Sequence, residues 1–209
     1  MPDWVRCALS APRFERYRKA ADGRIDVAIQ LYQRNIDISA AFYHPLHWLE
    51  VGLRNAINQR LRDQYSRLDW WVDVPLDKHD SRKIENVLEN VASRRRTADD
   101  IVAQPTFGFW VALLHKRNDR RFWVPSPHKA FPHYKGPRAR LHDDFYKMRN
   151  FRNRIMHHEP IFYLDLEEYR QRGHRLLGYL SPDALRHVQT TDRLTEVLDQ
   201  RDRAWRRLG

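Results

Sequence analysis

The chain has 209 residues and 42% of them are hydrophobic, which is typical of a globular protein with one sizeable core and excludes a disordered chain. The single cysteine, Cys7, excludes an intramolecular disulfide and a zinc site made of cysteines. The sequence has no run of eighteen apolar residues, so no membrane span is expected. The formal net charge of +11 at pH 7 favours a polyanionic partner, with nucleic acid before an anionic membrane surface.

The first third of the chain has the apolar spacing of helices. Ser10 is the predicted N-cap of a first helix that ends at Gly23, and two further helices are expected over residues 24–43 and 46–65. Because proline lacks a backbone N–H, we expect Pro45 to break or kink the chain between them. The stripe predicted for the second helix consists of Ile25, Ile29, Tyr32, Ile36 and Ala40.

The third of these helices carries a charge within its apolar face. Glu50 lies inside the stripe, and Arg54 lies at its edge. A buried carboxylate is costly unless a cation pairs with it, so Glu50 predicts a partner on another helix. The stripe itself consists of Leu46, Leu49, Leu53, Ile57 and Leu61.

Two more helices are predicted in the middle of the chain. Asp80 or Ser81 is expected to cap a helix over residues 82–95, and Thr106 a short and very apolar one. The run of three arginines at 94–96 suits a helix C-terminus, and contact with phosphate is the alternative interpretation.

Residues 118–137 are rich in proline and are expected to form one long ordered loop. Lys129 and Lys135 lie there among aromatic and histidine side chains, a mixture of charge and stacking surface that RNA contacts use. Packing of the loop over the core explains the same composition equally well. Loops of this length are uncommon without a function.

Residues 137–159 are predicted to form a helix with a cation in its apolar stripe. Arg152 points roughly 20° from Leu141 on a helical wheel, and Pro160 ends the helix. Since Glu50 and Arg152 each interrupt an apolar stripe, we expect them to pair where their helices pack. An ion pair that only fixes Arg152 is favoured over a direct catalytic role for Glu50. The stripe consists of Leu141, Phe145, Met148, Ile155 and Met156.

Polar residues that can act on a phosphodiester lie at the end of this helix. Asn153 and His157 are four residues apart and share a face. Histidine exchanges protons near neutral pH, and the Arg152 guanidinium can donate to phosphate oxygens. His158 fits the arginine-to-histidine spacing as well, and Asn153, one turn earlier, favours His157.

The C-terminal part is predicted to be helical. Asp165 begins a helix that runs to Tyr179, Ser181 opens a short one, and Thr190 or Thr191 opens a last one to residue 208. No strand pattern occurs. The sequence thus predicts an all-α antiparallel bundle over residues 1–165, with a C-terminal helical extension, residues 166–209, packed on the same domain.

Residues 152–160, Arg-Asn-Arg-Ile-Met-His-His-Glu-Pro, resemble the Arg-Asn-x3-His-His-Glu-Pro signature of the Abi-like abortive-infection proteins, which belong to the HEPN superfamily of helical RNA-cleaving domains. We call residues 152–160 the signature segment. Further stretches are similar to the same family in family order, at residues 8–17, 31–32, 46–57 and 106–111. The resemblance extends from about residue 8 to residue 163.

This resemblance implies an HEPN-like bundle and a metal-independent endoribonuclease in anti-phage defence or a toxin-like role. It implies a homodimer with two signature segments in one cleft, RNA as the partner, with tRNA as a candidate, and neither cofactor nor metal. The expected catalytic residues are Arg152, Asn153 and His157. The expected supporting residues are Glu50, Arg54, Asn55 and His158, and the expected RNA-binding residues are Arg149, Arg154, Lys129 and Lys135.

Two other functions fit the same residues. One is an RNA-binding or scaffold module without catalysis, and the other is a helical interaction partner of some other toxin or nuclease. An open groove at Arg152 and His157, rather than a sealed interior, would favour catalysis. The single cysteine and the absence of an apolar signal-peptide core lead us to expect a cytoplasmic protein.

Overall fold

The computed structural model describes residues 2–90, 97–118, 123–124 and 127–205, and these residues form an all-α fold, as the sequence predicts. No strand occurs within them. Short 3-10 turns lie at Trp70–Val72, Lys116–Asn118 and Pro127–Ala130. The helices are α1 (Asp3–Leu9), α2 (Ala11–Ala20), α3 (Ile25–Tyr65), α4 (Lys78–Asn90), α5 (Ala98–Ala103), α6 (Phe107–Leu113), α7 (Arg138–Met156), α8 (Leu166–Leu180), α9 (Pro182–Thr191) and α10 (Leu194–Trp205).

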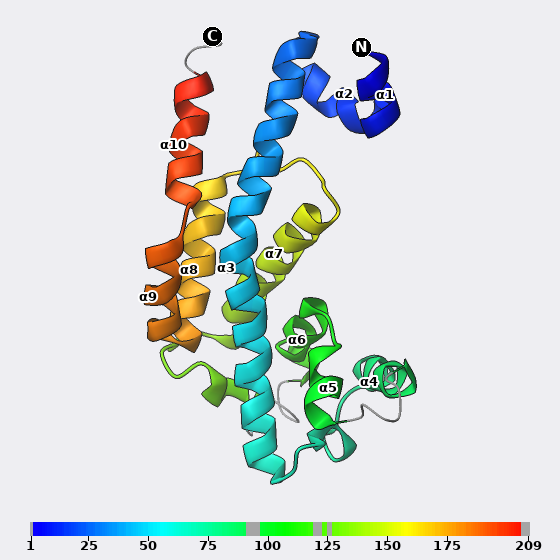
Figure 1. The fold of residues 1–209 in the computed structure, drawn as a ribbon. Helices are drawn as coiled ribbons and strands as arrows, with labels where there is room; N and C mark the ends of the chain where they lie inside the picture. Colours follow the sequence, from blue (N-terminus) through cyan, green and yellow to red (C-terminus); the bar gives the residue numbers. More distant parts are fainter. Residues whose placement is uncertain (1, 91–96, 119–122, 125–126, 206–209) are drawn as a thin grey trace.

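Of the break or kink predicted at Pro45, the break is wrong, because α3 is one helix with Pro45 in its interior. Phe42 and Leu46, on either side of the proline, are both buried in the main core. Packing on both sides therefore holds the helix together through the turn that lacks one backbone hydrogen bond. Figure 1 shows α3 running through the length of the molecule.

The stripe predicted for the first half of α3 is correct only in part. Its members Ile25, Ile29 and Tyr32 are half-buried against a cluster formed with α1 and α2. The Ile36 side chain is 44% exposed and Ala40 is exposed, whereas Val27, Ala28 and Leu31 are buried. These three pack with α1 and α2 in a second, smaller apolar cluster. Because α2 covers that side of α3, the buried face is rotated from the one that the spacing of isoleucines indicates.

Several helix boundaries differ from the predictions. Helix α4 begins at Lys78, so Asp80 lies inside it instead of capping it. The Asp80 carboxylate is fully buried and pairs with the guanidinium of Arg117 at 2.8 Å, which explains an acid at that position. Helix α10 begins at Leu194, while Thr190 and Thr191 belong to α9.

Two short helices have no counterpart among the predictions, α1 and α5. Helix α5 has a sequence signal, because Thr97 and Asp100 form a capping box at its start. The predicted arginine run at 94–96 lies outside the described residues, as does residue 208. The loop expected over residues 118–137 is described in part, and it contains the 3-10 turn at Pro127–Ala130.

Helix α7 lies between α6 and α8, and α8 lies beside α3 (Figure 1). The Phe151 ring of α7 is buried between Phe42 of α3, at 4.7 Å between ring centroids, and Tyr169 of α8, at 4.1 Å. Leu176 and Leu177 of α8 belong to the same core. The end of α7 is thus held by α8, which follows it in the chain, and by α3, which is distant in the sequence.

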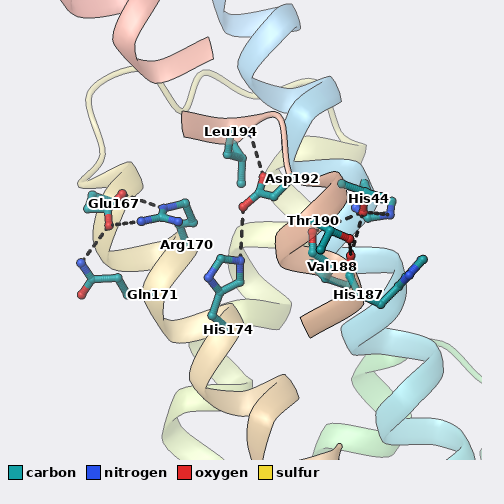
Figure 2. A network of polar contacts seen from close by, with 11 residues as sticks. His44, Glu167, Arg170, Gln171, His174, His187, Val188, Thr190, Asp192 and Leu194 are labelled. Carbon is teal, nitrogen blue, oxygen red and sulfur yellow. Dashed lines mark hydrogen bonds and ion pairs between the residues drawn. The ribbon is translucent and has the colours of Figure 1, made fainter. Parts of the chain in front are cut away.

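A buried acid joins α8 to the turn between α9 and α10 (Figure 2). The Asp192 carboxylate lies 3.3 Å from Nε2 of His174 and accepts a hydrogen bond from the Leu194 N–H at 2.8 Å. Burial by itself raises the pKa of Asp192, but the His174 imidazole, the Leu194 N–H and Arg170 together bring this pKa below its ordinary value.

We expect this carboxylate to make the protein acid-sensitive. Since its folded pKa is lowered, the stability it contributes is present above the pKa of the unfolded chain, about 3.9, and is lost as pH falls through the lower folded value. The measurement is the urea midpoint of the parent and of Asp192→Asn from pH 2 to pH 7. The variant should be less stable at pH 7 and show a smaller loss in the acid range; parallel curves would refute the assignment.

Candidate functional site

The signature segment forms the C-terminal end of α7 and the turn that follows. His157 is the C-cap and His158 has a φ of +56°. The Glu159 N–H donates to the Arg154 carbonyl at 2.8 Å, and the His158 N–H donates to the Ile155 carbonyl at 3.0 Å. These two bonds make a Schellman cap with histidine at the left-handed position that glycine usually occupies.

Neighbouring helices hold this turn in place. The Asn35 side chain of α3 is only 4% exposed, and its Oδ1 accepts the Ile161 N–H at 2.7 Å. Arg13 of α2 donates to the His158 carbonyl at 3.4 Å. Sequence reasoning missed Asn35, which lies about two helical turns before Phe42 on the buried face of α3, where a polar group needs a hydrogen-bond partner.

The predicted pair of Glu50 and Arg152 is confirmed. The Arg152 Nε donates to Oε2 of Glu50 at 3.1 Å, with the two side chains 28% and 24% exposed. The pair therefore lies at the edge of the core and is screened by water more than a buried pair. In the described part of the chain, the terminal nitrogens of Arg152 have no hydrogen-bond partner and can reach a ligand.

Removing one partner of this pair should cost less than in a sealed core. We expect Glu50→Gln to lower the free energy of unfolding by about 1–2 kcal/mol, between the values for exposed and buried pairs. Chemical denaturation of Glu50→Gln, Arg152→Met and the double variant forms the thermodynamic cycle. A coupling energy indistinguishable from zero would contradict the interaction.

Asn153 is half-buried and His157 is exposed on the outer side of α7, so neither is sealed in the interior. At 100° per residue, five side chains that can bind or react fall within an arc of about 80° on this side of the helix. We call it the outer stripe of α7, and it consists of His142, Tyr146, Arg149, Asn153 and His157.

The residues expected to bind RNA differ in how freely they can reach a ligand. Lys129 and Lys135 are exposed. The Arg149 guanidinium lies 4.3 Å from the centre of the Tyr146 ring, where it can meet solvent. Arg154 instead donates to the Tyr163 hydroxyl and lies 3.5 Å from Glu159, so much of its hydrogen-bonding capacity is used within the turn.

The other two supporting residues lie further along α3. Arg54 donates through Nη1 to the Ala103 carbonyl at the end of α5, at 3.3 Å, and so joins two helices. Asn55 is exposed. Within the described residues no three histidine, cysteine, aspartate or glutamate side chains gather as a group that could hold a metal ion.

An apolar groove of about 550 Å³ opens beside the signature segment, between the first half of α3 and the end of α7. Tyr43 and Ile36 on its wall are 55% and 44% exposed, and Met156 and His158 close its other side. Exposed apolar side chains gathered in one groove are typical of an interaction site.

Among the described residues, no helix is long and apolar enough to cross a membrane. Comparisons of the chain with models of protein families, with curated proteins and with solved structures found no match. The chemistry of the residues that the fold brings together at the end of α7 is therefore the basis for a functional proposal.

Proposed function

We propose that the protein is a metal-independent endoribonuclease, with its reactive groups in the signature segment. The observation that carries this proposal is the Glu50–Arg152 contact, which fixes a guanidinium five residues before an exposed histidine at a helix end. The resemblance of the signature segment to Abi-like HEPN proteins supports the same reaction and a cytoplasmic role in defence against phage.

In the proposed reaction, the 2′-oxygen of RNA attacks the adjacent phosphorus and the bond from phosphorus to the 5′-oxygen breaks. The proton of the 2′-hydroxyl is removed, and the departing 5′-oxygen receives a proton. His157 accepts or delivers one of these protons, Arg152 donates to the phosphoryl oxygens, and Asn153 orients the imidazole or holds phosphate. The products are a 2′,3′-cyclic phosphate and a 5′-hydroxyl.

We propose that a second copy of the chain packs on the apolar groove beside the signature segment. Packing of two such grooves would bring two signature segments into one cleft, as the resemblance implies. We expect sedimentation to detect a dimer that Tyr43→Arg disrupts, because the substitution places a charge on the exposed wall of the groove. A monomer at all concentrations would remove the composite site from the proposal.

The deciding assay incubates purified protein with RNA, including tRNA, in the presence and absence of EDTA. Cleavage should survive EDTA, end in a 2′,3′-cyclic phosphate, and disappear when the 2′-hydroxyl at the cut site is replaced by hydrogen. Loss of cleavage in EDTA, or a 3′-hydroxyl product, would show that another mechanism operates.

Binding without cleavage would instead favour the module without catalysis, which the charge of +11 supports equally. Affinity should fall steeply between low and high salt, because phosphate contacts release counterions. Salt-independent binding would argue against both functions.

A further inference from the structure

We propose that a second site, between α6 and α7, binds a nucleotide through both its base and its phosphate. The structure has a pocket of about 360 Å³ there, separate from the apolar groove at the signature segment. Its volume lies at the lower end of the range of small-molecule pockets, roughly 300–1,000 Å³, which suits a ligand of this size. We call it the α6–α7 pocket.

The floor of the α6–α7 pocket is apolar, and its walls are three rings and three charged side chains, those of Arg117, Arg149 and Asp143. The Asp143 carboxylate is paired with Lys147 at 2.8 Å. Gly108, Val111 and Ala112 of α6 form the floor. The rings are two imidazoles, 5.2 Å apart between ring centroids, and the ring of Tyr146, which is 43% exposed; the imidazoles belong to His115 and His142. Flat aromatic walls around a small cavity favour a planar ligand, since every base has a face that stacks on such rings.

The two imidazoles add hydrogen-bonding groups without charge. Burial lowers the pKa of His115, and Arg117 and Lys116 lower it further. Burial also lowers the pKa of His142, with His115 as the next cause. The lowered pKa favours the neutral form of each ring, which offers one donor and one acceptor. The Arg117 N–H donates to Nδ1 of His115 at 3.3 Å, which leaves Nε2 of that ring as the donor.

One cation of the pocket remains available for phosphate. Arg117 is held by Asp77 and Asp80, at 2.5 and 2.8 Å. Arg149 has no carboxylate partner among the described residues; its Nε and Nη2 bind the neutral amide oxygen of Asn150. Its Nη1 lies near Gly108: a Cβ atom added at Gly108 would be 4.0 Å from this nitrogen. Stacked on Tyr146 and facing the pocket, this guanidinium is placed to bind an anion next to a base.

The outer stripe of α7 connects the α6–α7 pocket to the signature segment. Tyr146 and Arg149 precede Asn153 and His157 on the same face, and Arg149 is about 12 Å from His157 along the helix axis. The nucleotide in the pocket can therefore be free in solution or one residue of an RNA strand that continues toward His157. Binding in the pocket does not require cleavage at the signature segment, so it can be tested by itself.

The test measures binding by calorimetry, with the four nucleoside monophosphates and with a short single-stranded RNA whose 2′-oxygens are methylated to prevent cleavage. Tyr146→Ala should weaken binding at least about five-fold, the loss expected for one stacked base. Arg149→Gln and the pocket-filling Ala112→Leu should weaken it by a similar factor. Arg140→Gln, on the opposite side of α7 and exposed, removes the same charge and should leave affinity unchanged.

Each outcome decides one part of the proposal. Binding of monophosphates that needs Tyr146 and Arg149 supports a free nucleotide, and binding of the methylated strand alone supports a nucleotide within RNA. Inorganic phosphate that binds as tightly as the monophosphates would refute a role for the base. Equal affinities for Tyr146→Ala, Arg149→Gln and Arg140→Gln, with all three variants folded by circular dichroism, would overturn the proposal whether or not the protein cleaves RNA.

Discussion

His157→Gln is expected to lower the rate of RNA cleavage about 10²–10⁴-fold, the contribution of a side chain that transfers a proton in the transition state. Glutamine preserves hydrogen bonding but cannot exchange a proton near neutral pH. His157 is exposed, so the substitution should leave the melting temperature nearly unchanged. The rate is measured with a labelled RNA under single-turnover conditions, which separates the chemical step from product release.

The neighbouring histidine provides a matched variant. His158 occupies the left-handed position of the Schellman cap, where glycine is the preferred residue. His158→Gly therefore removes the imidazole while it retains the backbone turn, and we expect cleavage close to that of the parent. His79 is exposed on α4, away from the signature segment, so His79→Gln is a control that removes a histidine and should leave cleavage unchanged. If His158→Gly and not His157→Gln abolishes cleavage, the two roles are exchanged; if neither does, the mechanism is wrong.

Phe151→Ala is expected to lower the free energy of unfolding by about 3–5 kcal/mol, the range for a large core side chain reduced to alanine. The Phe151 ring is 1% exposed and lies against Phe42 and Tyr169. Its removal would leave a cavity where α3, α7 and α8 meet, directly before Arg152. Urea denaturation gives the change in free energy, and the Glu50–Arg152 coupling should weaken in the same variant.

Two further variants show whether the cost arises from the buried ring. Phe151→Leu retains much of the apolar volume and should cost less than the alanine variant. Tyr146→Ala removes an aromatic ring from the exposed face of the same helix and should change stability by less than about 1 kcal/mol. If Phe151→Ala costs no more than Tyr146→Ala, the described packing of α7 is incorrect.

The sequence predicted the part of the site that depends on local periodicity. Leu141, Phe145 and Met148 lie on the buried side of α7 as expected. Two opposite charges, each inside an apolar stripe, were enough to predict the Glu50–Arg152 contact across 102 residues of sequence. Such a pairing can be predicted because an unpaired charge in a core is costly, so each partner indicates the need for the other.

Phe151 was absent from the predicted stripe for a tertiary reason. It lies to one side of that stripe, and its environment depends on Tyr169 of α8, which contacts α7 only after the chain has folded back. Asn35 was missed similarly, because the N–H that it binds belongs to Ile161 on a distant turn. Periodicity within one helix shows how wide an apolar face is, but not how many helices cover it.

The sequence by itself determined the all-α class, the position of α7 and the pairing of Glu50 with Arg152, because these follow from apolar spacing and from the cost of isolated charge. Only the tertiary structure decided that α3 continues through Pro45 and that the imidazoles of His115 and His142 meet above the floor of the α6–α7 pocket. The first depends on packing on both sides of the proline, which compensates for its missing hydrogen bond. The second depends on how closely α6 approaches α7, where Gly108 leaves room for Arg149.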